Sequence, residues 1–357
     1  MRNKMFIEVN STIIKGGDSY NGLLYSEDKG KTWNRSNVTS GVFHCLTVIG
    51  NNVIAASYNY DGLIYSEDNG HTWNQSNITS DSFYNLSTVG STVIAGSDSN
   101  KGLYYSEDNG KTWNQSNINI GNVLCLTVIG STIITCNNSY EGLLYSNDNG
   151  KTWNQTNIDT GHFNCLTTID NIVIAGGYSN NGLCYSEDNG KTWNQSNIRS
   201  GDFSFFIIIG NTIITGSWCN KGIFYSEDNG HTWIRSNTKY GYIWSFATIG
   251  NTVIAASDND EGLLYSEDKG QTWRQSNVDV GDFYCLTVIG NTVIVGGKYN
   301  LLYSENNGHT WNKSNINDSN FLYLTTIGNT VITYDNYDNN VLYSENSGKT
   351  WKESNIN

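Results

Sequence analysis

The polar and apolar positions of this chain follow a short, regular rhythm, well illustrated by residues 281–316. Residues 283–289 (FYCLTVI) form an apolar, β-branched run, and Gly290-Asn291 is a typical two-residue hairpin turn. Residues 292–296 (TVIVG), 301–304 (LLYS) and 310–316 (TWNKSNI) continue as further short runs between turn residues. No 3.6-residue helical period occurs, so the pattern predicts four short antiparallel strands.

The same pattern returns along the whole chain, marked by close copies of the octapeptide SEDNGKTW. The copies begin at Ser26, Ser66, Ser106, Ser146, Ser186, Ser226, Ser266, Ser304 and Ser344. Their spacing is 40 residues up to Ser266, then 38, then 40. Four short strands per repeat of about 40 residues are typical of a propeller blade. We therefore predict an all-β fold with one domain, residues 1–357, forming a single nine-bladed β-propeller. Blade 1 would occupy residues 1–40, blade 9 would end at Asn357, and no strand exchanged between the chain ends is expected.

The octapeptide, Ser-x-Asp-x-Gly-x-Thr-Trp, resembles the Asp-box or BNR repeat of sialidases, sortilin-type receptors, xyloglucan hydrolases and photosystem assembly factors. The resemblance implies that each box forms the turn between the third and fourth strands of a blade. The Asp would bind backbone amides of the turn, and the Trp would pack between blades. Nine residues occupy the Asp position: Asp28, Asp68, Asp108, Asp148, Asp188, Asp228, Asp268, Asn306 and Asn346. Asn keeps the acceptor and loses the charge, which suits a backbone cap better than a catalytic acid or metal ligand. We predict a structural role for all nine.

Composition limits the partners. The net charge of −13 and the pI of about 4.7 argue against a nucleic-acid partner. No apolar run is long enough to span a membrane, and the first residues do not resemble a leader peptide. Four of the seven cysteines, Cys45, Cys125, Cys165 and Cys285, share one repeat position, so we expect them to be small, buried and unpaired, as in a cytoplasmic protein. We expect a monomer with no metal and no cofactor.

The copies differ mainly in the loop between strands 2 and 3 and in the link to the next blade, which should share one face. Irregular tyrosines and both irregular tryptophans, Trp218 and Trp244, fall in these segments or in the strand that follows the link. One interpretation of these differences is random sequence drift in surface loops that are under no constraint. Drift should favour small polar residues, however, whereas aromatic residues gathered on one face indicate a contact surface.

Catalysis is not expected. A sialidase needs an arginine triad, a Tyr–Glu pair and an acid/base Asp, but the chain has five arginines and only Arg199 can reach the variable face. Another glycosidase would need two carboxylates about 5–10 Å apart. The acidic residues on the variable face are Asp61, Glu141, Asp202, Asp258, Asp260, Glu261 and Asp282. Acidic residues at loop tips usually only contact solvent. The xyloglucan hydrolases also use a cleft between two propellers, whereas this chain is predicted to form only one.

The best candidate ligand-binding site is the junction of the sixth and seventh blades, where the sequence departs most from the repeat. It contains Arg199, Trp218, Tyr240, Tyr242 and Trp244. The aromatic residues beside a cation could stack on a sugar ring or anchor a peptide; alternatively, the tryptophans only fill the interior. We therefore expect a non-enzymatic propeller that recognises a glycan or small ligand. A protein-interaction scaffold, a recently amplified propeller without a refined function, and a glycoside hydrolase are the alternatives.

Overall fold

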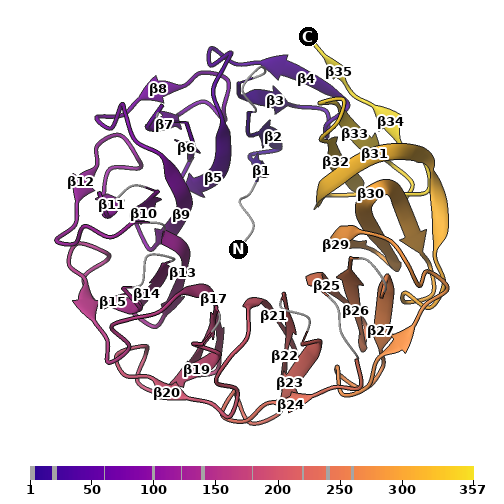
Figure 1. The fold of residues 1–357 in the computed structure, drawn as a ribbon. Coiled ribbons are helices and arrows are strands. Elements are labelled where there is room, and N and C mark those ends of the chain that lie inside the picture. The colour runs from indigo at the N-terminus through magenta and orange to yellow at the C-terminus, as the bar shows by residue number, and fades with distance from the viewer. Residues whose placement is uncertain are drawn as a thin grey trace. The chain divides into compact units, whose positions relative to one another are not determined.

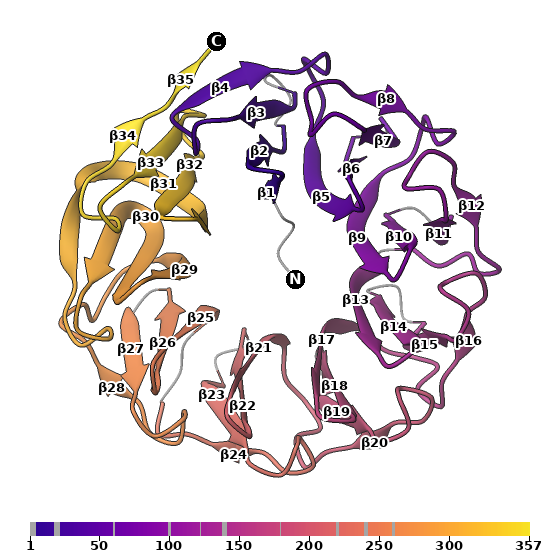
Figure 2. The ribbon, with the colours of Figure 1, turned by 180° about the vertical axis from the view of Figure 1, so that it is seen from behind.

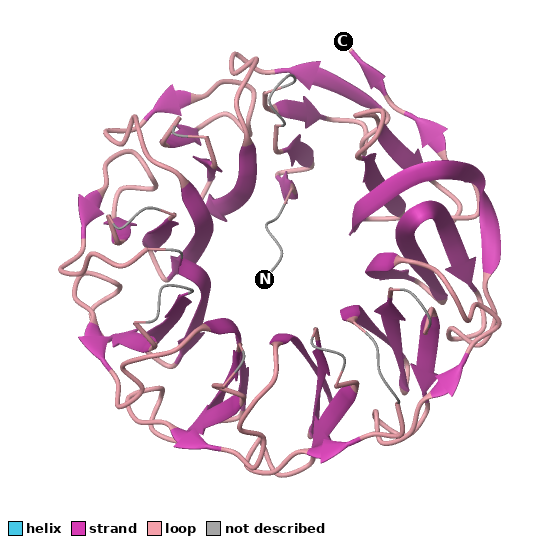
Figure 3. Ribbon diagram, viewed as in Figure 1, coloured by secondary structure: helices cyan, strands magenta, loops and turns pink. Residues whose placement is uncertain are grey.

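The computed structural model describes residues 5–17, 22–59, 61–98, 101–121, 123–137, 141–178, 180–218, 221–238, 242–258 and 261–357. Every regular element in these ranges is a β-strand, as predicted (Figure 3). The chain divides into two compact units. Unit 1 comprises Met1–Asn194 with Ile356–Asn357, and unit 2 comprises Gln195–Asn355.

The four strands of a repeat differ in burial, and the second repeat illustrates how. Its second strand, β6 (Asn52–Ser57), is buried at all six positions, which explains its unbroken small and β-branched run. Its first strand, β5 (Phe43–Ile49), is partly buried, whereas both residues of its fourth strand, β8 (Asn74–Gln75), are exposed. The third strand, β7 (Leu63–Ser66), pairs with β6 on one side and β8 on the other.

Unit 1 contains successive antiparallel sheets whose strands follow the chain order (Figures 1 and 2). The first sheet is β1 (Phe6–Val9), β2 (Thr12–Lys15), β3 (Leu24–Ser26), β4 (Thr32–Arg35) and β35 (Asn355–Ile356), and the second is β5 to β8. The third is β9 (Phe83–Val89), β10 (Thr92–Ser97), β11 (Leu103–Ser106) and β12 (Asn114–Gln115). The fourth is β13 (Val123–Ile129), β14 (Thr132–Asn137), β15 (Leu143–Ser146) and β16 (Asn154–Gln155). The fifth is β17 (Phe163–Ile169), β18 (Ile172–Gly177), β19 (Leu183–Ser186) and β20 (Asn194–Gln195).

Unit 2 contains two four-stranded sheets and one of six strands. The first is β21 (Phe203–Ile209), β22 (Thr212–Ser217), β23 (Ile223–Ser226) and β24 (Ile234–Arg235). The second is β25 (Ile243–Ile249), β26 (Thr252–Ser257), β27 (Leu263–Ser266) and β28 (Arg274–Gln275). The third is β29 (Phe283–Ile289), β30 (Thr292–Ser304), β31 (Asn312–Ile327), β32 (Thr330–Asp335), β33 (Val341–Ser344) and β34 (Lys352–Glu353).

The six-stranded sheet departs from the prediction of nine separate blades. β30 runs without a break through the second and third strands of the eighth repeat, and β31 joins its fourth strand to the first strand of the ninth. Nine Asp-boxes thus lie in eight sheets within the described residues. The number of blades stays a prediction.

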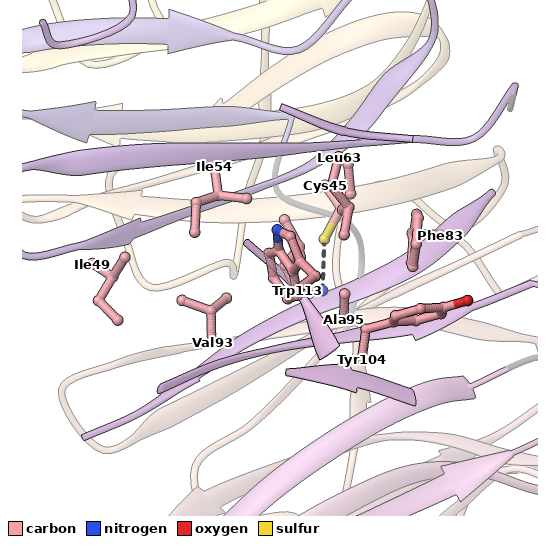
Figure 4. Close-up of a cluster of buried hydrophobic side chains, with 11 residues drawn as sticks. Cys45, Ile49, Ile54, Leu63, Phe83, Val93, Ala95, Tyr104 and Trp113 are labelled. Atoms are coloured by element: carbon pink, nitrogen blue, oxygen red, sulfur yellow. Dashed lines mark hydrogen bonds between the residues drawn. The ribbon is translucent and has the colours of Figure 1, made fainter. Parts of the chain in front are cut away.

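The core lies between successive sheets. One cluster combines Cys45 and Ile54 of the second sheet with Phe83, Tyr104 and Trp113 of the third (Figure 4). Trp113, an Asp-box residue, is only 3% exposed, so the box tryptophan packs between adjacent sheets as the resemblance implies.

Two expectations about the chain ends and the cysteines are wrong. β35 follows β4 in the first sheet, and the N–H of Asn357 donates to the carbonyl of Trp33 at 2.8 Å, so a terminal strand does join the first repeat. Cys125 is not unpaired but forms a disulfide with Cys136, which faces it directly on the neighbouring strand β14. Since disulfides are rare in the reducing cytoplasm, this bond does not support a cytoplasmic location. Cys45, Cys165 and Cys285 are buried thiols that belong to no disulfide of the described residues, as predicted.

Candidate functional site

The carboxylates of the Asp-boxes accept hydrogen bonds from groups of their own turns. Asp188 Oδ1 accepts hydrogen bonds from the Ser186 hydroxyl at 2.9 Å and from the N–H groups of Lys191 and Thr192 at 3.1 and 2.8 Å. Its Oδ2 accepts from the Thr192 hydroxyl at 2.7 Å. The tight turn places Asn189 and Gly190 at φ of 61° and 80°, where Asn and Gly are tolerated best.

These bonds also lower the pKa of Asp188. Partial burial alone raises it, but the bonds from Thr192, Ser186 and Lys191 outweigh that effect. The pKa is lowered in the same way at the other six box aspartates, namely Asp28, Asp68, Asp108, Asp148, Asp228 and Asp268.

Asn306 and Asn346 reproduce the network with one bond reversed. The Oδ1 of Asn306 accepts from the Ser304 hydroxyl and the Thr310 N–H, while its Nδ2 donates to the Thr310 hydroxyl at 2.8 Å. Asn346 does the same with Ser344 and Thr350. The box residues therefore hold the turn, and the functional site must be sought elsewhere.

The variable segments of each repeat meet at one end of its sheet. The residue after the second strand donates its N–H to the carbonyl of the residue before the first, as in Trp218 to Asp202 at 2.8 Å. The same bond joins Tyr58 to Val42, Asp98 to Ser82, Tyr178 to His162, Asp258 to Tyr242, Lys298 to Asp282 and Asn336 to Asn320. We call this the variable end of the repeat.

A β-bulge at the variable end leaves one residue of the first strand out of the ladder. In β25, for example, Ile243 pairs with Ser257 and Ser245 pairs with Ala256, so the register shifts at Trp244. Equivalent positions hold His44, Tyr84, Leu124, Asn164, Ser204 and Tyr284. Bulges re-aim side chains and are frequent beside functional sites.

In unit 2 the bulged residues Trp244 and Tyr284 gather with Phe205 and the loop residue Trp218 in a cluster of aromatic rings, which we call the Trp218 cluster. Trp218, in the loop after β22, lies with its ring centroid 5.1 Å from that of Trp244 and 5.9 Å from that of Phe205. Tyr284 meets Trp244 edge-on at 5.6 Å. All four side chains are partly buried, and the indole N–H of Trp218 donates to the Ile243 carbonyl at 3.0 Å. The cluster thus has fixed geometry and a partly open surface.

Two carboxylates act electrostatically on Tyr284 of this cluster. Burial and the carboxylates of Asp282 and Asp258 raise the pKa of Tyr284, although the Lys298 ammonium opposes the shift. Asp258 Oδ1 is buried and accepts no hydrogen bond from any residue that the structure describes. A buried carboxylate oxygen without a donor is unusual, because removing it from water is unfavourable unless another group replaces the water.

The five candidate ligand-binding residues from the sequence do not all lie together in the structure. It brings Trp218 and Trp244 into contact. Tyr242 is 41% exposed, and its carbonyl accepts from the N–H of Asp258 at 3.3 Å. Arg199 is exposed and does not contact the rings within the described part of the chain. Tyr240 lies outside the described residues.

The five candidate ligand-binding residues from the sequence did not include Phe205, Tyr284 or Asp258. Tyr284 and Trp244 share one repeat position, 40 residues apart, so the period itself could have identified it. The burial of Asp258 Oδ1 has no sequence signal, because the residue occurs in an ordinary acidic loop.

Neither a candidate metal-holding group nor a candidate membrane-spanning helix occurs in the ranges covered by the structure. No group of three or more His, Cys, Asp or Glu side chains there could hold a metal ion. In the same ranges no helix has the length and hydropathy needed to cross a membrane.

Comparisons with known proteins agree with this architecture. The BNR/Asp-box repeat model matches residues 104–115 and 144–155. No curated protein matches the chain by sequence. Among solved structures, the computationally designed Ika8 protein is 10% identical with a TM-score of 0.64, over 87% of this chain and 98% of that one. BamB from Moraxella catarrhalis is 12% identical with a TM-score of 0.58, over 95% of this chain and 99% of that one. The chain is therefore a β-propeller protein built from BNR/Asp-box repeats.

Proposed function

We propose that this chain is a non-enzymatic recognition protein that binds a cationic peptide segment of a partner protein at the Trp218 cluster. A lysine or arginine side chain would lie against the aromatic rings and donate to Asp258. The observation that carries the proposal is the buried Oδ1 of Asp258, which lacks a donor within the described residues and whose charge acts on Tyr284 of the packed ring cluster.

Charge and ring chemistry favour a cation. The faces of Trp and Tyr rings attract ammonium and guanidinium groups, and desolvation strengthens the attraction. A donor reaching Asp258 would supply the missing hydrogen bond, and charge-assisted bonds are the stronger kind. The net charge of −13 also attracts cationic partners from a distance.

The packing of the rings favours a peptide over an isolated sugar. Centroid separations of 5.1 and 5.6 Å mean that the rings lie against each other and leave no slot between them for a ligand. They form a contiguous apolar patch whose side chains are already ordered, which lowers the entropy lost on binding. Contiguous aromatic patches with few charges are typical of protein interfaces.

Glycan recognition is the second candidate, favoured by exposed single tyrosines. Tyr242 and Tyr299 are 41% and 47% exposed, and such rings suit stacking on a sugar. Tyr299 lies beside a Lys298 ammonium 5.1 Å from its ring centre.

The test is a titration of the protein with fluorescein-labelled hexalysine, followed by anisotropy, with chitotetraose and hexaglutamate as competitors. We expect hexalysine to bind, neither competitor to displace it, and Trp244→Ala to weaken binding about tenfold. Tyr178→Ala is the matched control. Tyr178 is an exposed aromatic residue at the repeat position equivalent to Trp218, but the next bulge position holds Ser204 and not an aromatic residue. Absence of hexalysine binding, displacement by chitotetraose, or unchanged affinity of folded Trp244→Ala would overturn the proposal.

A further inference from the structure

The arrangement of Trp218, Trp244 and Asp258 occurs a second time, in unit 1. Tyr58, Tyr84 and Asp98 each lie 160 residues earlier in the sequence, which is four repeats of 40. Tyr58 follows the second strand of one repeat, as Trp218 does, and Tyr84 is the bulged residue of the next, as Trp244 is.

The two ring pairs have nearly the same geometry. The centroids of Tyr58 and Tyr84 are 5.2 Å apart with planes inclined at 50°, against 5.1 Å and 44° for Trp218 and Trp244. Tyr58 is 41% exposed, so this pair also has an open surface.

The repeats between them do not reproduce the pair. The corresponding residues are Asp98 with Leu124, Asn138 with Asn164, Tyr178 with Ser204, and, beyond the second pair, Asp258 with Tyr284. An aromatic loop residue followed by an aromatic bulge residue therefore occurs twice in the sequence, each time with an Asp after the next second strand. Drift at independent positions gives no reason for the three residues to return together.

We propose that Tyr58, Tyr84 and Asp98 form a second site for the same ligand chemistry, so that the protein is bivalent and binds two cationic segments. This inference rests on the proposed function of the Trp218 cluster. A partner carrying both segments on one chain gains affinity, since the second contact forms within the complex.

The two sites differ in strength for a structural reason. The hydroxyls of Tyr58 and Tyr84 are 3.1 Å apart, and Tyr84 also interacts with the Asp98 carboxylate, which contributes to raising the pKa of the phenol. At the second pair Trp244 replaces Tyr84, and Asp258 Oδ1 is left without a donor among the described residues. A ligand at Asp98 must compete with the phenol, so the Tyr58 site should be the weaker one.

Isothermal titration calorimetry with trilysine amide tests the inference, because this probe spans at most about 11 Å and gives the number of sites directly. We expect two sites for the wild type, with the weaker one lost in Tyr84→Ala, the tighter one lost in Trp244→Ala, and both lost in the double variant. Tyr178→Ala should retain both. Asp98→Asn and Asp258→Asn are isosteric and guard against loss of folding; each should weaken its own site about tenfold.

The outcomes separate the two proposals. One site that is removed by Trp244→Ala and unaffected by Tyr84→Ala and Asp98→Asn would overturn bivalency and leave the proposed function standing. No binding of trilysine or hexalysine to the wild type would overturn both.

Discussion

The side chain of Asn157 holds both backbone groups of Trp193 in the next repeat. Its Nδ2 donates to the Trp193 carbonyl at 2.9 Å, and its Oδ1 accepts from the Trp193 N–H at 2.7 Å. The same two-bond clamp joins Asn37 to Trp73, Asn77 to Trp113, Asn117 to Trp153, Asn197 to Trp233, Asn237 to Trp273, Asn277 to Trp311 and Asn315 to Trp351. The amide thus mimics a strand neighbour and links successive repeats.

Replacing Asn157 by Ala should lower the free energy of unfolding by about 1–3 kcal/mol, because the N–H and carbonyl of Trp193 lose their partner. Asn154, exposed in β16 of the same repeat, provides the control. Asn154→Ala should stay within about 0.5 kcal/mol of the wild type. Urea unfolding followed by circular dichroism measures both. Equal midpoints for the two variants would show that the clamp contributes nothing to stability.

The Asp-box turn predicts a difference between two substitutions at Asp188. Asp188→Asn should have little effect on stability, since Asn306 and Asn346 already form the same network with one bond reversed. Asp188→Ala removes both carboxylate acceptors from the turn and should cost about 1–2 kcal/mol. The readout is the thermal midpoint of each variant. Coincident midpoints for Asn and Ala would contradict the capping role.

The lowered pKa of the seven box aspartates predicts acid sensitivity. A carboxyl whose folded pKa lies below its ordinary value of 3.8 stabilises the fold at neutral pH, and this contribution is lost as the pH falls through the folded pKa. Urea midpoints should therefore decrease between pH 5 and lower pH. Replacing all seven aspartates by Asn should make that decrease shallower. An identical pH profile for this variant would mean that the box carboxylates do not carry the acid sensitivity.

The Cys125–Cys136 disulfide should stabilise the hairpin of β13 and β14 by about 3 kcal/mol, the value expected for closing a short loop. Alkylation of the unfolded protein without reductant should leave Cys125 and Cys136 unlabelled. Cys136→Ala should still fold, because Cys45 faces Ala56 at the same positions of another repeat. Dithiothreitol should lower the unfolding midpoint of the wild type and leave that of Cys136→Ala unchanged. Labelling of all seven cysteines would show that the bond does not form.

Much of the fold could be predicted because the local sequence of each repeat determines its strands and turns. The hairpin Gly290-Asn291, the Asp-box turns and the buried run of β6 all appear where the sequence pattern placed them. The merging of the last two repeats was not predicted. The eighth repeat is two residues shorter, and β30 continues through the segment that forms a loop in its neighbours. The pairing of β35 with β4 depends on contacts made only after folding, which no local pattern encodes. The pairing of Cys125 with Cys136 follows from the register of their hairpin about Gly130-Ser131, but it was missed because the cysteines were compared only between repeats.

The candidate site was predictable only in part. The contact of Trp218 with Trp244 follows from their positions in adjacent repeats. The equivalence of this pair with Tyr58 and Tyr84 could be recognised only from the position of the β-bulge in the structure. A one-residue bulge redirects a side chain without altering the hydrophobic pattern of the sequence. The unsatisfied oxygen of Asp258 depends on burial by neighbouring segments, whereas similar loop acids elsewhere are solvated.

The most direct measurement of the central claim is the affinity of Asp258→Asn for hexalysine relative to the wild type. This substitution keeps the shape of the side chain and removes the charge. The recognition account predicts a loss of about tenfold to a hundredfold in affinity, with an unchanged or higher thermal midpoint. The reason is that the buried Oδ1 of Asp258 has no donor among the described residues until the ligand supplies one. Wild-type affinity in a folded Asp258→Asn protein would contradict the account.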